Sequence, residues 1–74
     1  MNVSDLLSSD PETMSGAVVF KGTRVPVDAL FENLDAGMPL EECFDNFPTV
    51  DRYLVHGVLR LAAEDLKQKL EKAA

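Results

Sequence analysis

Four side chains near the start of the last predicted helix could contact nucleic acid. Arg52, His56 and Arg60 recur every four residues, so a helix would place them on one face, opposite its apolar stripe. Arginine is the usual bidentate reader of guanine in the major groove, and Tyr53 can reach a phosphate. Because no acidic residue occurs over 52–63, this face is a candidate DNA-binding surface. A solvated helix face that carries two arginines is the alternative.

A second candidate site is the segment 22–27, which reads GTRVPV. Gly22 gives access to φ > 0 for a sharp turn, while Pro26 fixes its own φ and makes the preceding residue extended. Thr23 and Arg24 are therefore expected on a stiff, displayed corner. We expect Gly22, Thr23, Arg24 and Pro26 to contact a partner protein or a second copy of the chain. The alternative for Arg24 is a solvated charge.

Catalytic residues, metal ligands and cofactor sites are not expected. His56 has no nucleophile near it in the sequence, and paired carboxylates such as Glu41 and Glu42 are typical of solubilising helix surfaces. Cys43 is the only cysteine, which excludes an internal disulfide, and the only histidine is far from it in sequence, which argues against a metal site. The glycines fit no phosphate-binding pattern. The sequence therefore predicts a binding protein and not an enzyme.

The charge of the chain is unevenly distributed. Residues 28–51 hold seven acidic residues and no lysine or arginine, whereas residues 52–74 carry a net positive charge. Neutralisation of phosphates supplies most non-specific affinity for DNA, so the acidic segment opposes DNA binding. DNA binding would then need a dimer, a basic partner, or contacts confined to the last helix and Arg24. The acidic segment favours a role in protein interaction instead.

The hydrophobic pattern predicts one mainly α-helical domain over residues 1–74. An apolar, β-prone run indicates a short strand or hairpin at about 17–27. Helical spacing follows, with helices expected at about 27–36, 39–47 and 50–72. A glycine ends the first of these helices and a proline ends the second. Three helices of unequal length joined by tight turns belong to the helix-turn-helix class.

The small size of the chain predicts self-association. A domain of 74 residues buries a modest share of its surface and often needs a staple, a metal or a partner. Since a disulfide and a metal are not expected, a homodimer is, formed through the strand at 17–27 or through the last helix. The chain begins with no secretory signal and has no apolar run that could span a bilayer. A cytoplasmic protein without membrane contact is therefore expected.

Several motifs, taken in order, resemble the family of small bacterial proteins called domain of unknown function 433. The matching pieces, which cover residues 9–63, are DPE at 10–12, Gly16, the apolar run 18–20, KGTRVPV at 21–27, LDAG at 34–37, PLEE at 39–42, FPT at 47–49 and the apolar helix that follows. The chain departs from the family pattern at Ala17 and Val18, where the family often has a basic residue and a proline. It also departs at Gly57 and Arg60 in the last helix.

This resemblance implies a homeodomain-like helix-turn-helix fold with a short β element before it. Many members of the family look like VapB-type antitoxins, found beside a toxin that resembles a PIN-domain ribonuclease. The implied function is that of an antitoxin, which dimerises, binds its cognate toxin and contacts operator DNA. The acidic residues support a second hypothesis, a protein-interaction module with the same fold and no DNA binding.

Overall fold

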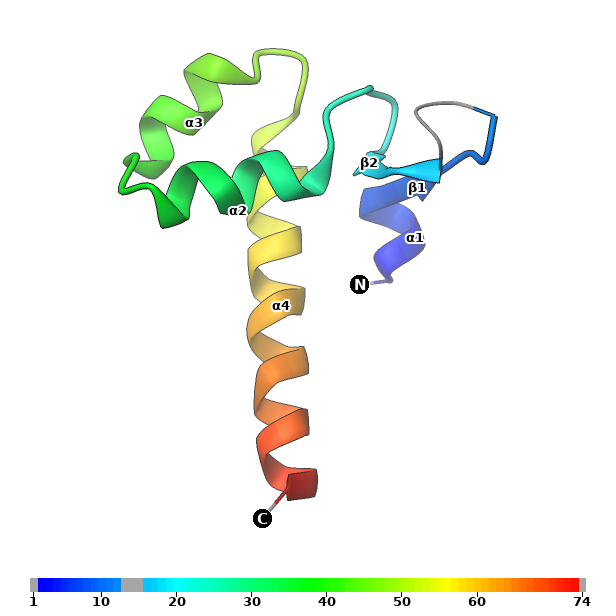
Figure 1. Cartoon of the computed structure of the whole chain (residues 1–74), viewed down its shortest axis with the longest axis vertical. Helices are drawn as coiled ribbons and strands as arrows, with labels where there is room; N and C mark the ends of the chain where they lie inside the picture. Colours follow the sequence, from blue (N-terminus) through cyan, green and yellow to red (C-terminus); the bar gives the residue numbers. More distant parts are fainter. Residues whose placement is uncertain (1, 13–15, 74) are drawn as a thin grey trace.

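The protein is mainly helical, with a short β hairpin near its N-terminus, as the sequence predicts. Residues 2–12 and 16–73 are described by a computed structural model. Their elements, in chain order, are α1 (Val3–Leu6), β1 (Leu7–Ser9), β2 (Val18–Phe20), α2 (Val27–Asp35), α3 (Leu40–Asn46) and α4 (Arg52–Ala73). In Figure 1, α2 and α3 lie at one end of α4, and the hairpin with α1 lies to one side of them.

The hairpin joins two segments, and only one of them was expected. β1 and β2 pair antiparallel, with Leu7 opposite Phe20 and Ser9 opposite Val18. The expected β segment at 17–27 thus contains only the three residues of β2 and a single bridge between Val19 and Pro26. Helix α1 and strand β1 were not predicted, because each has only three or four residues.

Proline and glycine set the bounds of the two short helices. The residues before α2 and α3 are Pro26 and Pro39, and both have extended backbones. The first turns carry acidic residues, which interact favourably with the positive end of the helix dipole. Gly37 follows α2 with φ of 91°, a left-handed conformation that glycine adopts without strain.

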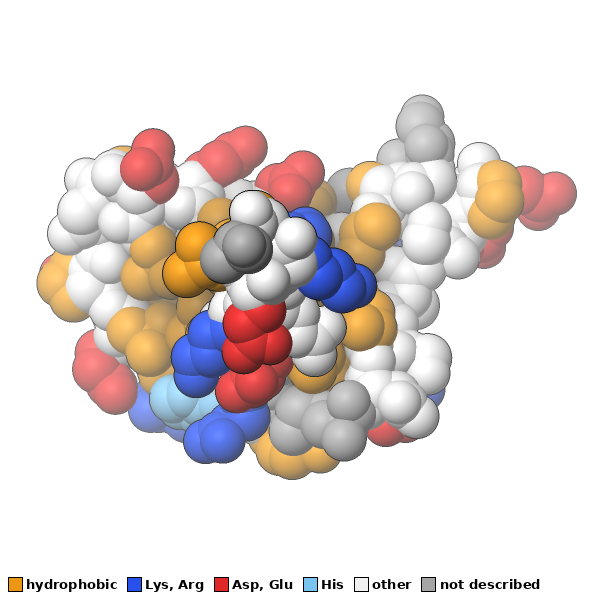
Figure 2. Space-filling model, turned by 90° about the horizontal axis from the view of Figure 1, so that it is seen from below, with side chains coloured by type: hydrophobic (Ala, Val, Ile, Leu, Met, Phe, Trp, Pro, Cys, Tyr) orange, Lys and Arg blue, Asp and Glu red, His pale blue; other side chains and the backbone are white. Residues whose placement is uncertain are grey.

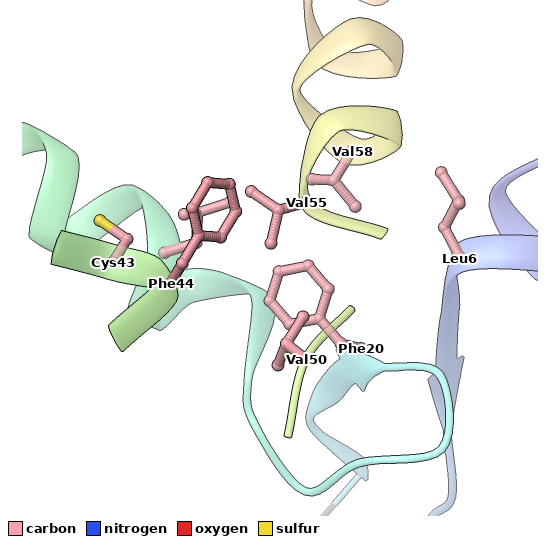
Figure 3. Close-up of a cluster of buried hydrophobic side chains, with 8 residues drawn as sticks. Leu6, Phe20, Cys43, Phe44, Val50, Val55 and Val58 are labelled. Carbon is pink, nitrogen blue, oxygen red and sulfur yellow. The ribbon is translucent and has the colours of Figure 1, made fainter. Parts of the chain in front are cut away.

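The core collects side chains from α1, β2, α2, α3 and the first half of α4. Figure 3 shows Phe20 of β2, Phe44 of α3 and Val55 of α4 converging, with Leu6 pointing in from the N-terminal segment. Leu6, Phe20 and Leu30 are fully buried, at 0% exposure. The other buried hydrophobic residues are Cys43, Phe44, Val50, Val55 and Val58. Because Leu6 belongs to this cluster, α1 and β1 are integral to the fold.

Helix α4 extends beyond the elements that pack against it, which together form the body of the molecule. Its 22 residues span about 33 Å at 1.5 Å per residue, and the longest extent of the molecule is 38 Å. Val55, Gly57 and Val58 of its first half are buried, whereas every described residue over 63–73 is exposed. The second half of α4 therefore projects from the body (Figure 1).

Candidate functional site

The GTRVPV corner is held in place by its own backbone and by a threonine hydroxyl. The Thr23 amide donates to the Phe20 carbonyl at 3.0 Å, which closes a turn whose third residue is Gly22, with φ of 78°. The Thr23 Oγ1 donates to the same carbonyl at 2.8 Å and accepts from the Val25 amide at 3.1 Å. Thr23 thus stiffens the turn from inside.

The outer side of this corner is accessible. Arg24 is exposed, and it borders a shallow hollow together with Gly22, Thr23 and Thr49. Pro26 does not border this hollow, because it bridges to Val19 of β2 and precedes α2. Gly22, Thr23 and Arg24 therefore form one surface, while Pro26 supports it. Contact of this corner with a partner stays a prediction.

Arg52, the first residue of α4, is engaged with α3. Its Nη1 and Nη2 atoms donate to Oε1 and Oε2 of Glu41 at 3.3 and 3.2 Å. Its Cζ atom lies 4.2 Å from the centre of the Phe44 ring, a cation–π geometry. The side chains of Arg52 and Glu41 remain 59% and 76% exposed. Arg52 therefore acts as a surface strut that ties the start of α4 to α3.

His56 and Arg60 continue the face that Arg52 begins. The His56 ring lies 5.7 Å from the Phe44 ring at 56° between planes, so Phe44 contacts both His56 and Arg52. His56 and Arg60 border one hollow on α4, with Lys67 further along. Tyr53 is 58% exposed, and its backbone amide donates to Oδ1 of Asp51 at 2.8 Å. The helix thus places the three basic residues on one face, but Leu59 borders the same hollow as His56 and Arg60, so this face is not opposite the whole apolar stripe. DNA contact stays a prediction.

Basic and acidic side chains lie side by side on α4. Figure 2 looks along α4 from its free end and shows lysine and arginine side chains around the pale blue histidine, with acidic side chains directly beside them and others at the opposite edge. Within α4, the Asp65 carboxylate lies 2.8 Å from Lys69 Nζ. The hydrogen bond and charge of Asp65 raise the pKa of Lys69 above its ordinary value of 10.5. The surface of α4 is therefore mixed in charge.

The described residues contain no group of three or more histidine, cysteine, aspartate or glutamate side chains that could hold a metal ion. Cys43 is a free thiol, 1% exposed in the core, where it packs as a small apolar side chain. Over residues 2–12 and 16–73, no helix is long and apolar enough to cross a membrane.

The sequence did not predict where apolar surface stays uncovered. Leu66 and Leu70 are 67% and 71% exposed on the second half of α4. A groove of about 460 Å³ between α1, α2 and α4 has an apolar lining that includes Val3 and Phe31, which are 58% and 38% exposed. The sequence predicts an apolar stripe along the last helix, and this helix was one of the two candidate dimer surfaces. Helix lengths were the available signal, since two helices of 9 and 7 residues cannot cover one of 22.

A small helical domain with a leading β hairpin, a stiff turn and an overhanging last helix defines the class of this protein. The model of the family described as "protein of unknown function (DUF433)" matches residues 7–68, and the chain belongs to this family. The match begins at β1 and ends within the projecting half of α4. The resemblance inferred from the motifs is thereby confirmed. No curated protein and no solved structure gives a significant match.

Proposed function

We propose that this protein acts by binding another protein, as the antitoxin of a pair whose toxin resembles a PIN-domain ribonuclease. The observation that supports protein binding is the apolar surface left open on α4, where Leu66 and Leu70 are about two-thirds exposed. Exposed apolar patches on small proteins mark interaction sites. The choice of a toxin as the partner rests on the resemblance of the DPE and KGTRVPV motifs to antitoxins of the family.

The proposal includes a homeodomain-like helix-turn-helix built from α2, α3 and α4. Residues 36–39 join α2 to α3, and residues 47–51 join α3 to α4. Connections of this length are compatible with a helix-turn-helix arrangement. We also propose that the protein works in the cytoplasm as a homodimer, because a domain this small gains stability from a second copy. Sedimentation at micromolar concentration tests the dimer, and a single species near 8.1 kDa would count against it.

Operator DNA is a second candidate ligand. It is favoured by the shared hollow of His56 and Arg60 and by the lack of acidic residues over 52–63. The strut between Arg52 and Glu41 counts against it, since Arg52 would have to leave its carboxylate to reach a base. That strut, together with the acidic segment 28–51, supports the alternative of an interaction module that does not bind DNA.

Inhibition of the nuclease tests the proposed function. The proposal requires a PIN-domain nuclease encoded beside the gene; the full chain is mixed with that nuclease, and cleavage of RNA is followed. We expect a complex and loss of cleavage, and we expect Leu66→Ser with Leu70→Ser to restore cleavage. Val3→Ser is the matched control, because Val3 is an exposed apolar residue of α1, 58% exposed, outside the surfaces proposed to bind. Failure of the wild-type chain to bind and inhibit the nuclease would refute the antitoxin function.

A further inference from the structure

One face of the projecting half of α4 has the spacing of a coiled-coil seam. Leu59, Ala63, Leu66 and Leu70 follow one another at intervals of four, three and four residues. This is the heptad spacing that lines apolar side chains along one edge of a helix. Exposure rises along these four residues, which we call the α4 seam: Leu59 is half-buried, and Leu66 and Leu70 are largely open.

The residues that flank the α4 seam are basic. Arg60 and Lys67, seven residues apart, lie along one flank, and Lys69 lies on the other. His56, Arg60 and Lys67 border a hollow whose apolar lining is Leu59 and Ala63, and Glu64 borders it as well. The residues next to the apolar strip are thus mainly cations, with one carboxylate at the rim of the hollow.

Glu64 and Asp65 are not seam residues, but each pairs with a lysine that flanks the seam, and Glu64 borders the hollow beside it. Lys67 Nζ is 3.6 Å from Glu64, and Lys69 Nζ is 2.8 Å from Asp65. All four of these side chains are more than half exposed. Such pairs contribute little to stability, so a partner can draw the lysines toward itself at small cost.

Leu59 packs against the core, but the rest of the α4 seam is not covered by another element of the described chain. Every described residue over 63–73 is exposed. Isolated helices of this length are marginal in water, so the projecting half lacks the packing that normally stabilises a helix. A partner that covered the seam would bury Leu66 and Leu70 and provide that packing.

We propose that the α4 seam docks one amphipathic helix of a partner protein, whose apolar stripe is flanked by glutamate and aspartate. This inference rests on the proposed function and names the chemistry of the partner surface. The apolar anchors of that helix would enter between the leucines, as in helix-in-groove recognition. Its carboxylates would face Arg60, Lys67 and Lys69. A second copy of α4 is disfavoured, because pairing two such seams gathers the cations of both copies around one strip.

Two synthetic helical peptides test the charge preference. They share one leucine heptad pattern, but one is flanked by glutamate and the other by lysine. Binding to the full chain is measured by fluorescence anisotropy at physiological salt. We expect the glutamate peptide to bind about tenfold or more tightly than the lysine peptide, because close unlike charges favour association. Equal binding of the two peptides, or no binding of the glutamate peptide, would overturn the proposal.

Variants of the chain locate the site. Leu66→Ser with Leu70→Ser should weaken the glutamate peptide about tenfold or more, since central apolar anchors dominate interfaces. Val3→Ser, at the separate groove, should leave its binding unchanged. Arg60→Glu with Lys67→Glu should reverse the peptide preference. Lys72→Glu, on the face of α4 away from the seam, is the charge control and should not reverse it. An unchanged preference in the Arg60 and Lys67 variant would overturn the proposal.

Two further outcomes distinguish this inference from a dimer formed through α4 and from the antitoxin function. A wild-type dimer that dissociates in the Leu66→Ser, Leu70→Ser variant would assign the α4 seam to a second copy and overturn the acidic partner. If the glutamate peptide binds with the expected preference while the nuclease is not inhibited, the seam is supported and the antitoxin function is refuted.

Discussion

Replacing Arg52 by alanine should lower the free energy of unfolding by about 1–1.5 kcal/mol. Arg52 makes a bidentate pair with Glu41, but both side chains are more than half exposed, so the ion pair contributes about 0.5 kcal/mol. The contact with the Phe44 ring at 4.2 Å contributes about 0.5–1 kcal/mol at an exposed site. In a domain of this size, each kcal/mol shifts Tm by about 4–8 °C.

Urea and thermal unfolding of a double-mutant cycle separate these two contributions. Glu41→Gln should cost about 0.5 kcal/mol, and the coupling between Glu41 and Arg52 should be of the same size. Arg52→Lys should lose most of the stabilisation, because lysine lacks the planar fork of arginine. A stability of Arg52→Ala equal to that of wild type would refute the strut and leave Arg52 available for DNA. A cost of Glu41→Gln as large as that of Arg52→Ala would refute the contribution of Phe44.

Further predictions concern the fold, the pH response and ligand exclusion. Leu6→Ala should cost about 2–5 kcal/mol in urea unfolding because Leu6 is fully buried; a cost near zero would show that α1 lies outside the core. Gly37→Ala should cost about 1–3 kcal/mol because of its positive φ alone, since an added Cβ meets no atom of the described chain within 4 Å. The pKa of Lys69 is raised by Asp65, so their stabilising contact persists below pH 10.5 and is lost as pH rises past the folded-state pKa. The helix content measured by circular dichroism should be higher for wild type than for Lys69→Met below pH 10.5. The two should have equal helix content above the folded-state pKa. Arg60 belongs both to the candidate DNA-binding face of α4 and to the flank of the α4 seam. The glutamate peptide should therefore displace any DNA bound to α4 in a gel shift.

The sequence predicted the elements that proline and glycine delimit. Pro26, Gly37 and Pro39 mark the bounds of α2 and the start of α3, and the helical spacing beyond residue 50 marks α4. Helix α1 and strand β1 could not be predicted, because strand pairing of Leu7 with Phe20 depends on contacts far along the chain. Three or four residues carry no usable periodicity.

The candidate site was predicted in part. Spacing alone placed Arg52, His56 and Arg60 on one face of a helix. The pairing of Arg52 with Glu41 depends on how the turn after α3 orients two helices, which periodicity does not report. The sequence predicts the apolar stripe of α4 but not which of its leucines stay exposed, because an apolar stripe shows that a face is to be covered and not which chain covers it.

Amide hydrogen exchange along α4 tests most directly whether its projecting half is a binding surface. For the chain alone, amides over residues 63–73 should exchange fast compared with those near the buried residues Val55 and Val58, because few contacts hold them closed. Addition of the glutamate peptide should slow exchange over 63–73 and leave the hairpin unchanged. Strong protection of these amides in the free chain, or no change on adding the peptide, would contradict a binding role for the second half of α4.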